Sequence, residues 1–460
     1  MPLSQMGAAL RPIIGIAVVT LMFLGVAIWN GFPLVFYDTG AYLVEGLRGA
    51  FLVERSPVYS LFLAGAGSAV SLWPVIALQS ALTAYVIWEV ARIEVPGLTT
   101  AGFCAIGFGL TLLTGIGWYT AQVEPDCMTA LVVLGAYLLL FRAPRLGRRR
   151  IGLIAFITGL AVACHPSHMG LIGGLLIVGA AWRLLFHFFP RRTPVGLPQM
   201  RLLPAVSALV LALVLTLASN LALAHALFLS RSGSVFVFGR LMQDGIVKKV
   251  LDDSCVNGAK PYVLCDYRDR LAPTANAWLW GNNPGFKAQG GFRGGQEEDS
   301  RIILESFKRY PFLNLRMAVY DSVLQFFMFK TGDGIESQER ILKPGIQSMM
   351  PRQLHAYLEA RQQRKLIRFQ DINMVHVTVG MLSLLGLLLL LNHAALRRRW
   401  DEAALPGLVL LALIGNAIIC GTFSNPHDRY QSRLIWVPGL VLLLARARDP
   451  KALQPAEGPI

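Results

Sequence analysis

Apolar runs of about 20 residues recur along most of the chain, separated by short polar loops. A run of that length crosses a hydrocarbon core as one α-helix. The pattern predicts about ten transmembrane helices, at 12–30, 73–92, 98–119, 127–141, 151–165, 167–189, 202–228, 373–392, 404–423 and 432–446. We therefore expect an all-α polytopic membrane protein.

The segment "SPVYSLFLAGAGSAVS" (56–71) is apolar, but its pattern does not decide whether it crosses. Arginine-rich loops of membrane proteins typically face the cytoplasm. Four such loops occur here: "RAPRLGRRR" (142–150), "PRRTP" (190–194), "RRRWDE" (397–402) and "ARARDPK" (445–451). All four fall inside, with both chain ends, only if 56–71 does not cross. We therefore expect this segment to lie as a juxtamembrane or re-entrant helix.

This topology divides the chain into three parts. They are an N-terminal transmembrane core at 1–228 with an external loop at 31–72, a mixed external insert at 229–372 of soluble and interfacial character, and C-terminal helices with a cytoplasmic tail at 373–460. The amphipathic stretch 310–329 within the insert contains Arg316 and Asp321, which favours an interfacial helix over another crossing.

Composition supports this class. Of the 460 residues, 54% are hydrophobic and only 15% charged, whereas a soluble protein carries about 25% charged residues. The formal charge of +15 comes from the loops. A basic soluble face with interleaved aromatic residues is not apparent, so nucleic acid is not an expected partner. Loops rich in arginine and poor in lysine indicate a bacterium of high genomic GC content, and hence an inner membrane with the external side in the periplasm.

The six cysteines fall into two groups. Four lie in or beside apolar runs, where a thiol acts as a small hydrophobic group: Cys104, Cys127, Cys164 and Cys420. Cys255 and Cys265 lie in the long polar segment, and if that segment is external they can close a small disulfide loop. Their spacing is wrong for a zinc finger, and no second pair accompanies them.

Ionisable residues gather at the predicted external edge. The first loop holds Asp38, Tyr42, Glu54 and Arg55; "QVEPDCM" holds Glu124 and Asp126; "CHPSH" holds His165 and His168; and "SNPHDRYQSR" holds His427, Asp428, Arg429, Tyr430 and Arg433. Acids and imidazoles near hydrocarbon depth are costly unless they pair or serve a site. Their shared side predicts a functional site there.

Each cluster also has a structural explanation. Asp38 can cap a helix, and Glu124 and Asp126 flank a proline, which suits a helix start whose dipole favours acids. The two histidines can be turn residues bonded to backbone carbonyls, and the sequence places no third ligand for a metal beside them. The two arginines can snorkel at the interface, although arginines on the external side also indicate an anionic partner.

The chemical interpretation combines these groups. A carboxylate at the bilayer edge can take a proton from an acceptor hydroxyl, and a nearby cation can hold a lipid-linked phosphate as it leaves. Together they suit glycosyl transfer from a polyprenyl-phosphate sugar to a periplasmic acceptor, which can be a glycolipid, a polysaccharide or a protein.

The layout resembles the C-type membrane glycosyltransferases, in particular the aminoarabinose transferases and protein O-mannosyltransferases. The resemblance rests on the order of "FYDTGAYL", "ERSPVYSLFLAG", "VEPDCMTALVV", "GLAVACHPSHMGLIGG" and "HDRYQSRLIWVPGL" along the chain. It covers the first seven or so spans and, more loosely, the last two. The first loop lacks the paired acids of the O-mannosyltransferases, and the insert at 229–372 matches no domain of the family.

The resemblance implies a role for each matched residue. Asp38 corresponds to the catalytic base, while Asp126 and Glu124 shape the acceptor site or bind a divalent cation where the family uses one. His165 stands where many relatives have lysine, and Tyr430 and the arginines beside it correspond to the donor-phosphate element. The resemblance adds no other cofactor.

Other functions remain open. A transporter or flippase of a lipid-linked saccharide favours ionisable groups near mid-membrane and broken helices in paired halves. A noncatalytic membrane scaffold presenting the 229–372 domain predicts that Asp38 is dispensable. An acyltransferase using His165 or His168 is a further alternative.

Overall fold

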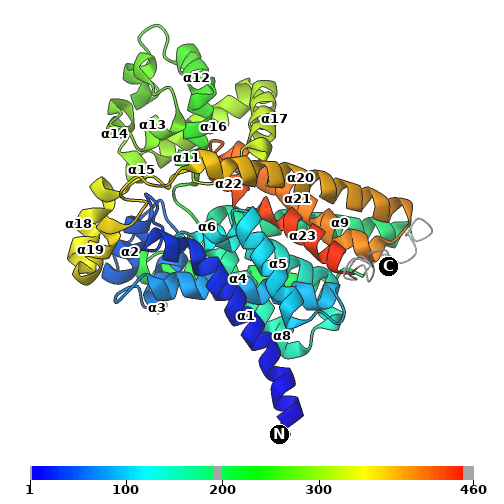
Figure 1. Ribbon diagram of the computed structural model, residues 1–460. Helices are drawn as coiled ribbons and strands as arrows, with labels where there is room; N and C mark the ends of the chain where they lie inside the picture. Colours follow the sequence, from blue (N-terminus) through cyan, green and yellow to red (C-terminus); the bar gives the residue numbers. More distant parts are fainter. Residues whose placement is uncertain (1–2, 190–198, 449–460) are drawn as a thin grey trace.

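The computed structural model describes residues 3–189 and 199–448, which are helical apart from loops and one isolated β-bridge (Figure 1). The predicted loop at 190–194 and the tail after residue 448 lie outside these described residues.

Seven helical segments in the described residues are long and apolar enough to cross a membrane. They are α1 (Leu3–Asn30), α4 (Trp73–Glu94), the segment Pro125–Arg145 built from η1 (Pro125–Cys127), α7 (Met128–Tyr137), η2 (Leu138–Arg142) and η3 (Ala143–Arg145), α9 (Pro166–Phe188), α10 (Leu202–Ala224), α20 (Phe369–Leu396) and α21 (Trp400–Phe423). The chain is therefore an all-helical, multi-pass membrane protein.

Three other predicted spans form shorter helices. These are α5 (Thr100–Leu113), α8 (Arg148–Ala163) and α23 (Trp436–Arg448), with 14, 16 and 13 residues. The predicted span 98–119 breaks at Thr114, whose hydroxyl bonds the Leu110 carbonyl, before α6 (Ile116–Thr120). At 1.5 Å per residue these helices extend about 20–24 Å, less than a hydrocarbon core of about 30 Å. All three pack against other helices of the bundle, α5 against α1, α8 against α10 and α23 against α20.

Arginine-rich segments meet at one end of the bundle. The Arg142 guanidinium lies 2.7 Å from the Glu94 carboxylate and 2.5 Å from that of Asp401. Arg448, at the end of α23, pairs with Glu94 as well. The loops at 142–150 and 397–402 and the end of α23 thus share one end of the molecule, as the charge pattern predicts.

The first loop forms two short helices at the opposite end, α2 (Thr39–Arg48) and α3 (Pro57–Gly65). The nine residues of α3 are too few to cross a bilayer alone. Gly46 allows α2 to approach α3, because a Cβ atom there would lie 2.3 Å from the Ser60 carbonyl oxygen. The buried Glu45 carboxylate joins them by accepting hydrogen bonds from Ser60 Oγ and the Leu52 amide.

The insert consists of many short helices. They are α11 (Gly233–Gln243), α12 (Ile246–Ser254), η5 (Val263–Arg270), α13 (Ala275–Leu279), α14 (Pro284–Ala288), α15 (Gly291–Gly294), α16 (Gln296–Arg309), α17 (Pro311–Phe327), α18 (Glu339–Met349), η6 (Pro351–Gln353) and α19 (Leu354–Glu359). Helices α11 to α16 enclose a separate core around Phe238, Trp278 and Ile302. In contrast, α18 and α19 join the main core and lie beside α2 (Figure 1).

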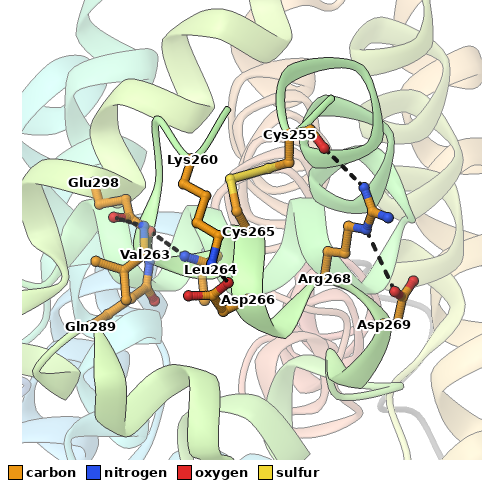
Figure 2. The surroundings of a disulfide bond; sticks show 10 residues. All are labelled: Cys255, Lys260, Val263, Leu264, Cys265, Asp266, Arg268, Asp269, Gln289 and Glu298. Carbon is orange, nitrogen blue, oxygen red and sulfur yellow. Dashed lines mark hydrogen bonds and ion pairs between the residues drawn. A yellow bond between two sulfur atoms is a disulfide. The ribbon is translucent and has the colours of Figure 1, made fainter. Parts of the chain in front are cut away.

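The predicted disulfide between Cys255 and Cys265 is present (Figure 2). It joins the end of α12 to η5. The Glu298 carboxylate holds η5 by accepting hydrogen bonds from the Val263 and Leu264 amides, at 2.8 and 3.2 Å. Covalent and polar contacts therefore fix this part of the insert.

Candidate functional site

The site begins with a two-bond bridge between the first loop and the segment before η1. The Leu34 amide donates to the Ala121 carbonyl, and the Val123 amide donates to the Leu34 carbonyl, each at 2.9 Å. The Thr39 hydroxyl adds a hydrogen bond to the Val123 carbonyl. This pairing brings Asp38 and Glu124 to the same place, although 86 positions separate them in the numbering.

Asp38 occupies the N-cap position of α2, but its side chain makes no capping hydrogen bond. Instead, Asp38 Oδ1 lies 2.5 Å from Arg55 Nη2, and the carboxylate side chain remains 14% exposed. Arg55 also donates to the Glu54 carbonyl and stacks on Trp280, its Cζ 5.1 Å from the ring centroid. The arginine thus orients the partly open carboxylate and links it to the insert.

Asp126 is held by a buried arginine from the last external loop. Arg433 Nη1 lies 2.6 Å from Asp126 Oδ1, and the Arg433 side chain has no exposed surface. Arg433 Nη2 donates to Asn416 Oδ1 and Ser167 Oγ, at 3.1 and 3.2 Å. Through its two Nη groups, Arg433 positions Asp126 and joins η1 to α9 and α21.

Arg429 is more open, with 16% of its side chain exposed. Its Nη1 lies 3.5 Å from Glu124 Oε1 and 3.9 Å from Asp126 Oδ2. The guanidinium stacks over Phe36, with Cζ 4.5 Å from the ring centroid, and over Tyr430. Burial alone would lower the pKa of Arg429, but Tyr430 and the nearby acidic side chains, Asp126 first among them, raise it, so the group stays cationic.

Glu124 is buried, and its Oε2 atom has no hydrogen-bond partner among the described residues. Burial raises the pKa of Glu124 well above its ordinary value, and the charges of Asp38 and Asp126 raise it further, against the opposing effect of Arg429. Glu124 is also at an N-cap position without a capping hydrogen bond. It is therefore a carboxyl group that favours its protonated form beside a partly exposed carboxylate.

Tyr42 lies buried behind this pair, with its ring edge-on to Tyr59 at 4.9 Å between centroids. Burial raises the pKa of Tyr42. Tyr42 therefore contributes packing and a neutral hydroxyl.

The two histidines have local roles. His165 caps α9: its Nδ1 accepts a hydrogen bond from the Ser167 amide at 3.2 Å. Burial lowers the pKa of His165, and the nearby His168 and arginines lower it further, so the ring is neutral. His168 is fully buried, with one ring nitrogen 2.7 Å from Thr129 Oγ1 and the other 2.8 Å from the Ala161 carbonyl. Both nitrogens of His168 thus serve helix packing.

The last external loop is anchored to the insert. His427 exchanges two backbone hydrogen bonds with the Gln325 side chain, at 2.8 and 2.9 Å, and its ring lies 3.4 Å from the Asp333 carboxylate. Burial would raise the pKa of Asp333, but the hydrogen bond and charge of His427 lower it. Asp428 accepts a hydrogen bond from the Lys330 amide. These contacts fix the loop that carries Arg429.

The structure thus brings together Asp38, Arg55, Glu124, Asp126, Arg429, Tyr430 and Arg433 in one cluster, with Tyr42 and His165 beside it. Sequence reasoning missed Phe36, Ser167, Asn416, Trp280 and Asp333. Only Asp333 had a signal that charge could have revealed, because it lies in the "KTGDG" turn of the insert. The others are uncharged residues whose proximity depends on helix packing.

The cluster contains three carboxyl groups and three guanidinium groups, and because Glu124 favours its protonated form the cations exceed the carboxylates by one. Asp126 and Glu124 face arginines, so these acids already have cationic partners. The described residues contain no group of three or more histidine, cysteine or acidic side chains placed to hold a metal ion. The cluster can accept a proton at Asp38 and can present a cation, Arg429, to an anionic group.

No family model, curated protein or solved structure matches this chain.

Proposed function

We propose that this protein is a membrane glycosyltransferase that uses a polyprenyl-phosphate sugar as donor. The observation that carries the proposal is the pairing of a partly exposed carboxylate, Asp38, with partly exposed or adjacent arginines at the end of the bundle opposite the arginine-rich loops. A donor of this kind has its phosphate at the same boundary, between hydrocarbon and water.

In this mechanism Asp38 is the general base. The acceptor oxygen forms a bond to the anomeric carbon, the bond from that carbon to the phosphate oxygen breaks, and polyprenyl phosphate leaves. Asp38 takes the proton of the acceptor hydroxyl. Arg55 holds the Asp38 carboxylate in place at 2.5 Å, and configuration at the anomeric carbon is inverted because a single displacement occurs.

Arg429 binds the departing phosphate. Its stacking on Phe36 and Tyr430 fixes the guanidinium plane, and a charge-assisted hydrogen bond from arginine suits phosphate oxygens. Arg433 keeps Asp126 in position, and Asp126 in turn supports Arg429. The protonated Glu124 can donate a hydrogen bond toward the reacting groups without adding negative charge near the phosphate.

The sides of the membrane follow from the two ends of the bundle. We assign the arginine-rich end to the cytoplasm, by the positive-inside bias, and the site with the insert to the periplasm of a bacterial inner membrane. On this assignment α5, α8 and α23 complete ten crossings. The insert borders the site through Trp280 and Asn276, which contact Arg55 and His427, and we assign acceptor choice to it.

A transporter is less well supported, because the ionisable cluster lies at one end of the helices and not near their middle. A scaffold is less well supported because a stability role alone does not account for the open carboxylate of Asp38.

The test uses purified protein in liposomes with polyprenyl phosphates that carry a tritiated hexose or pentose and with a bacterial cell-envelope extract as the source of acceptor, and it measures release of free polyprenyl phosphate. We expect Asp38→Asn to lower the rate by about 10²–10⁴-fold. The matched control is Asp252→Asn, an exposed aspartate on the insert that pairs with Lys248. Full activity of a folded Asp38→Asn protein overturns the base assignment. Movement of intact donor across the bilayer without release supports the transporter.

The binding step is measured separately with polyprenyl phosphate alone. We expect Arg429→Gln to weaken binding by about 10–100-fold, because a hydrogen bond to a charged group contributes roughly 1.5–3 kcal/mol. Unchanged binding by this variant removes Arg429 from the phosphate site.

A further inference from the structure

Helix α17 has its polar and apolar sides reversed relative to a helix in water. Its buried residues are Asn314, Asp321 and Gln325, which lie on one face. The large apolar residues Phe312, Leu315, Val319, Val323 and Phe327 lie on another face and are 55–85% exposed. Their spacing of three or four residues makes a continuous stripe along the helix.

The buried polar side chains of α17 face groups of the protein, although Asn314 Oδ1 and Asp321 Oδ2 have no hydrogen-bond partner among the described residues. Asn314 donates to the Ser306 carbonyl at 3.1 Å, and Gln325 exchanges two hydrogen bonds with the His427 backbone. Asp321 lies 3.8 Å from Arg240, which belongs to α11. Polar contacts therefore fix which side of α17 faces the protein, and the apolar stripe faces away from it.

Position along the bundle decides what the stripe meets. The middle of α17 touches the end of the span α21, where a Cβ atom on Gly421 would lie 2.7 Å from the Asp321 backbone. The hydroxyls of Ser322 and Thr422 are 3.4 Å apart. Such close approach at a glycine is typical of helices packed in a membrane. Helix α17 thus lies level with the last turn of a span.

Exposed apolar side chains also lie on that span near its contact with α17. Ile418 and Phe423 of α21 lie within one turn of Gly421, and they are 48% and 57% exposed. Exposed cations flank the stripe: Lys308 precedes α17, and Lys330 follows it. Apolar residues bounded by lysines suit the boundary between acyl chains and anionic headgroups.

We infer that the α17 stripe is buried in the outer leaflet, so that the lipid bilayer itself is the partner of this face of the insert. The helix then holds the insert against the membrane. Because Gln325 bonds the backbone of His427, the loop that contains Arg429 is attached to a helix embedded in lipid. This inference is independent of the reaction proposed above.

The test is the accessibility of spin labels in nanodiscs that contain one chain each. Cysteine replaces Val319 or Val323 in a Cys104→Ala background, and the nitroxide's collision rates with oxygen and with a water-soluble nickel chelate are compared. Ile418→Cys is the lipid control, and Lys287→Cys, an exposed residue of α14, is the aqueous control.

We expect labels at 319 and 323 to behave like the label at 418, with high oxygen and low nickel accessibility. If they instead behave like the label at 287 in protein whose disulfide is intact, the stripe faces water in the isolated chain, and a protein partner or a second copy becomes its occupant. That result overturns the inference.

Discussion

Asp126 and Arg433 are 307 positions apart in the sequence, yet Asp126 Oδ1 and Arg433 Nη1 lie 2.6 Å apart in a fully buried ion pair. The pair joins the start of the fourth predicted span to the end of the loop that precedes the last predicted span. It therefore closes the bundle around the site and fixes the two elements that supply Glu124 and Arg429.

Removal of one partner is expected to destabilise the fold. Arg433→Met leaves the Asp126 charge buried without its closest cation, which costs about 3–5 kcal/mol. Lys248→Met, in an exposed pair on the insert, is the control and is expected to change little. The free energy of unfolding in mixed micelles measures both. The double variant Arg433→Met with Asp126→Asn should recover part of the loss, and equal losses in the single and double variants contradict an ionic role.

Glu124 provides a prediction about activity. Because burial and neighbouring acids raise its pKa, glutamine is a neutral substitute for the form it favours. We expect Glu124→Gln to keep the rate of polyprenyl-phosphate release within about tenfold, whereas loss of a group that must accept a proton costs about 10²–10⁴-fold. A loss as large as that of Asp38→Asn would show that Glu124 acts as a carboxylate.

The orientation of the bundle can be tested by labelling. Arg149, in an arginine-rich loop, and Lys287, on the insert, are both exposed. A cysteine at position 149 should react with an impermeant maleimide only from the cytoplasmic side, and a cysteine at position 287 only from the periplasmic side. If both cysteines react from the same side of sealed vesicles, the two ends of the bundle do not lie on opposite sides of the membrane, and the periplasmic assignment of the site is wrong.

The disulfide should stabilise the insert locally. Closing a loop between cysteines at a sequence separation of ten, Cys255 and Cys265, contributes about 2–3 kcal/mol. In the Cys255→Ser, Cys265→Ser protein we expect faster tryptic cleavage within η5 at Arg268 and Arg270. Cleavage in the loop at 397–402 serves as the internal control. Equal acceleration at both places would indicate that the disulfide supports the whole fold.

A buried acid gives the insert a pH dependence. Burial raises the pKa of Asp299 to about 8, and Gln289 Nε2 lies 3.2 Å from its carboxylate. Because the folded state binds this proton more tightly than the unfolded state, stability falls as pH rises from about 4 to 8, by up to about 1.4 kcal/mol per unit. Asp299→Asn should flatten this fall. Amide hydrogen exchange across α16, corrected for intrinsic exchange rates, measures this pH dependence of stability. An unchanged slope in Asp299→Asn contradicts its assignment to Asp299.

The sequence alone determined the class of the protein and the grouping of its charges. An apolar run in a membrane forms a helix, because no water is present there and the backbone N–H and C=O groups must form hydrogen bonds with one another. For that reason the sequence could predict the seven longest spans. The positive-inside bias then predicted that the arginine-rich loops share one end. It also predicted a common location for Asp38, Glu124, Asp126 and Arg429. The pairing of Cys255 with Cys265 followed from their position in the one long polar segment.

Only the tertiary structure decided the partner of each charge. Asp38 could be a helix cap by sequence, but the packing of α2 on α3 gives it Arg55 instead. Arg429 and Arg433 look equivalent in "HDRYQSR", yet one is partly open and the other fully enclosed. The buried polar side of α17 was also not visible locally. These outcomes depend on helix rotation and register between segments that lie from 17 to 307 residues apart, and local propensity does not encode either.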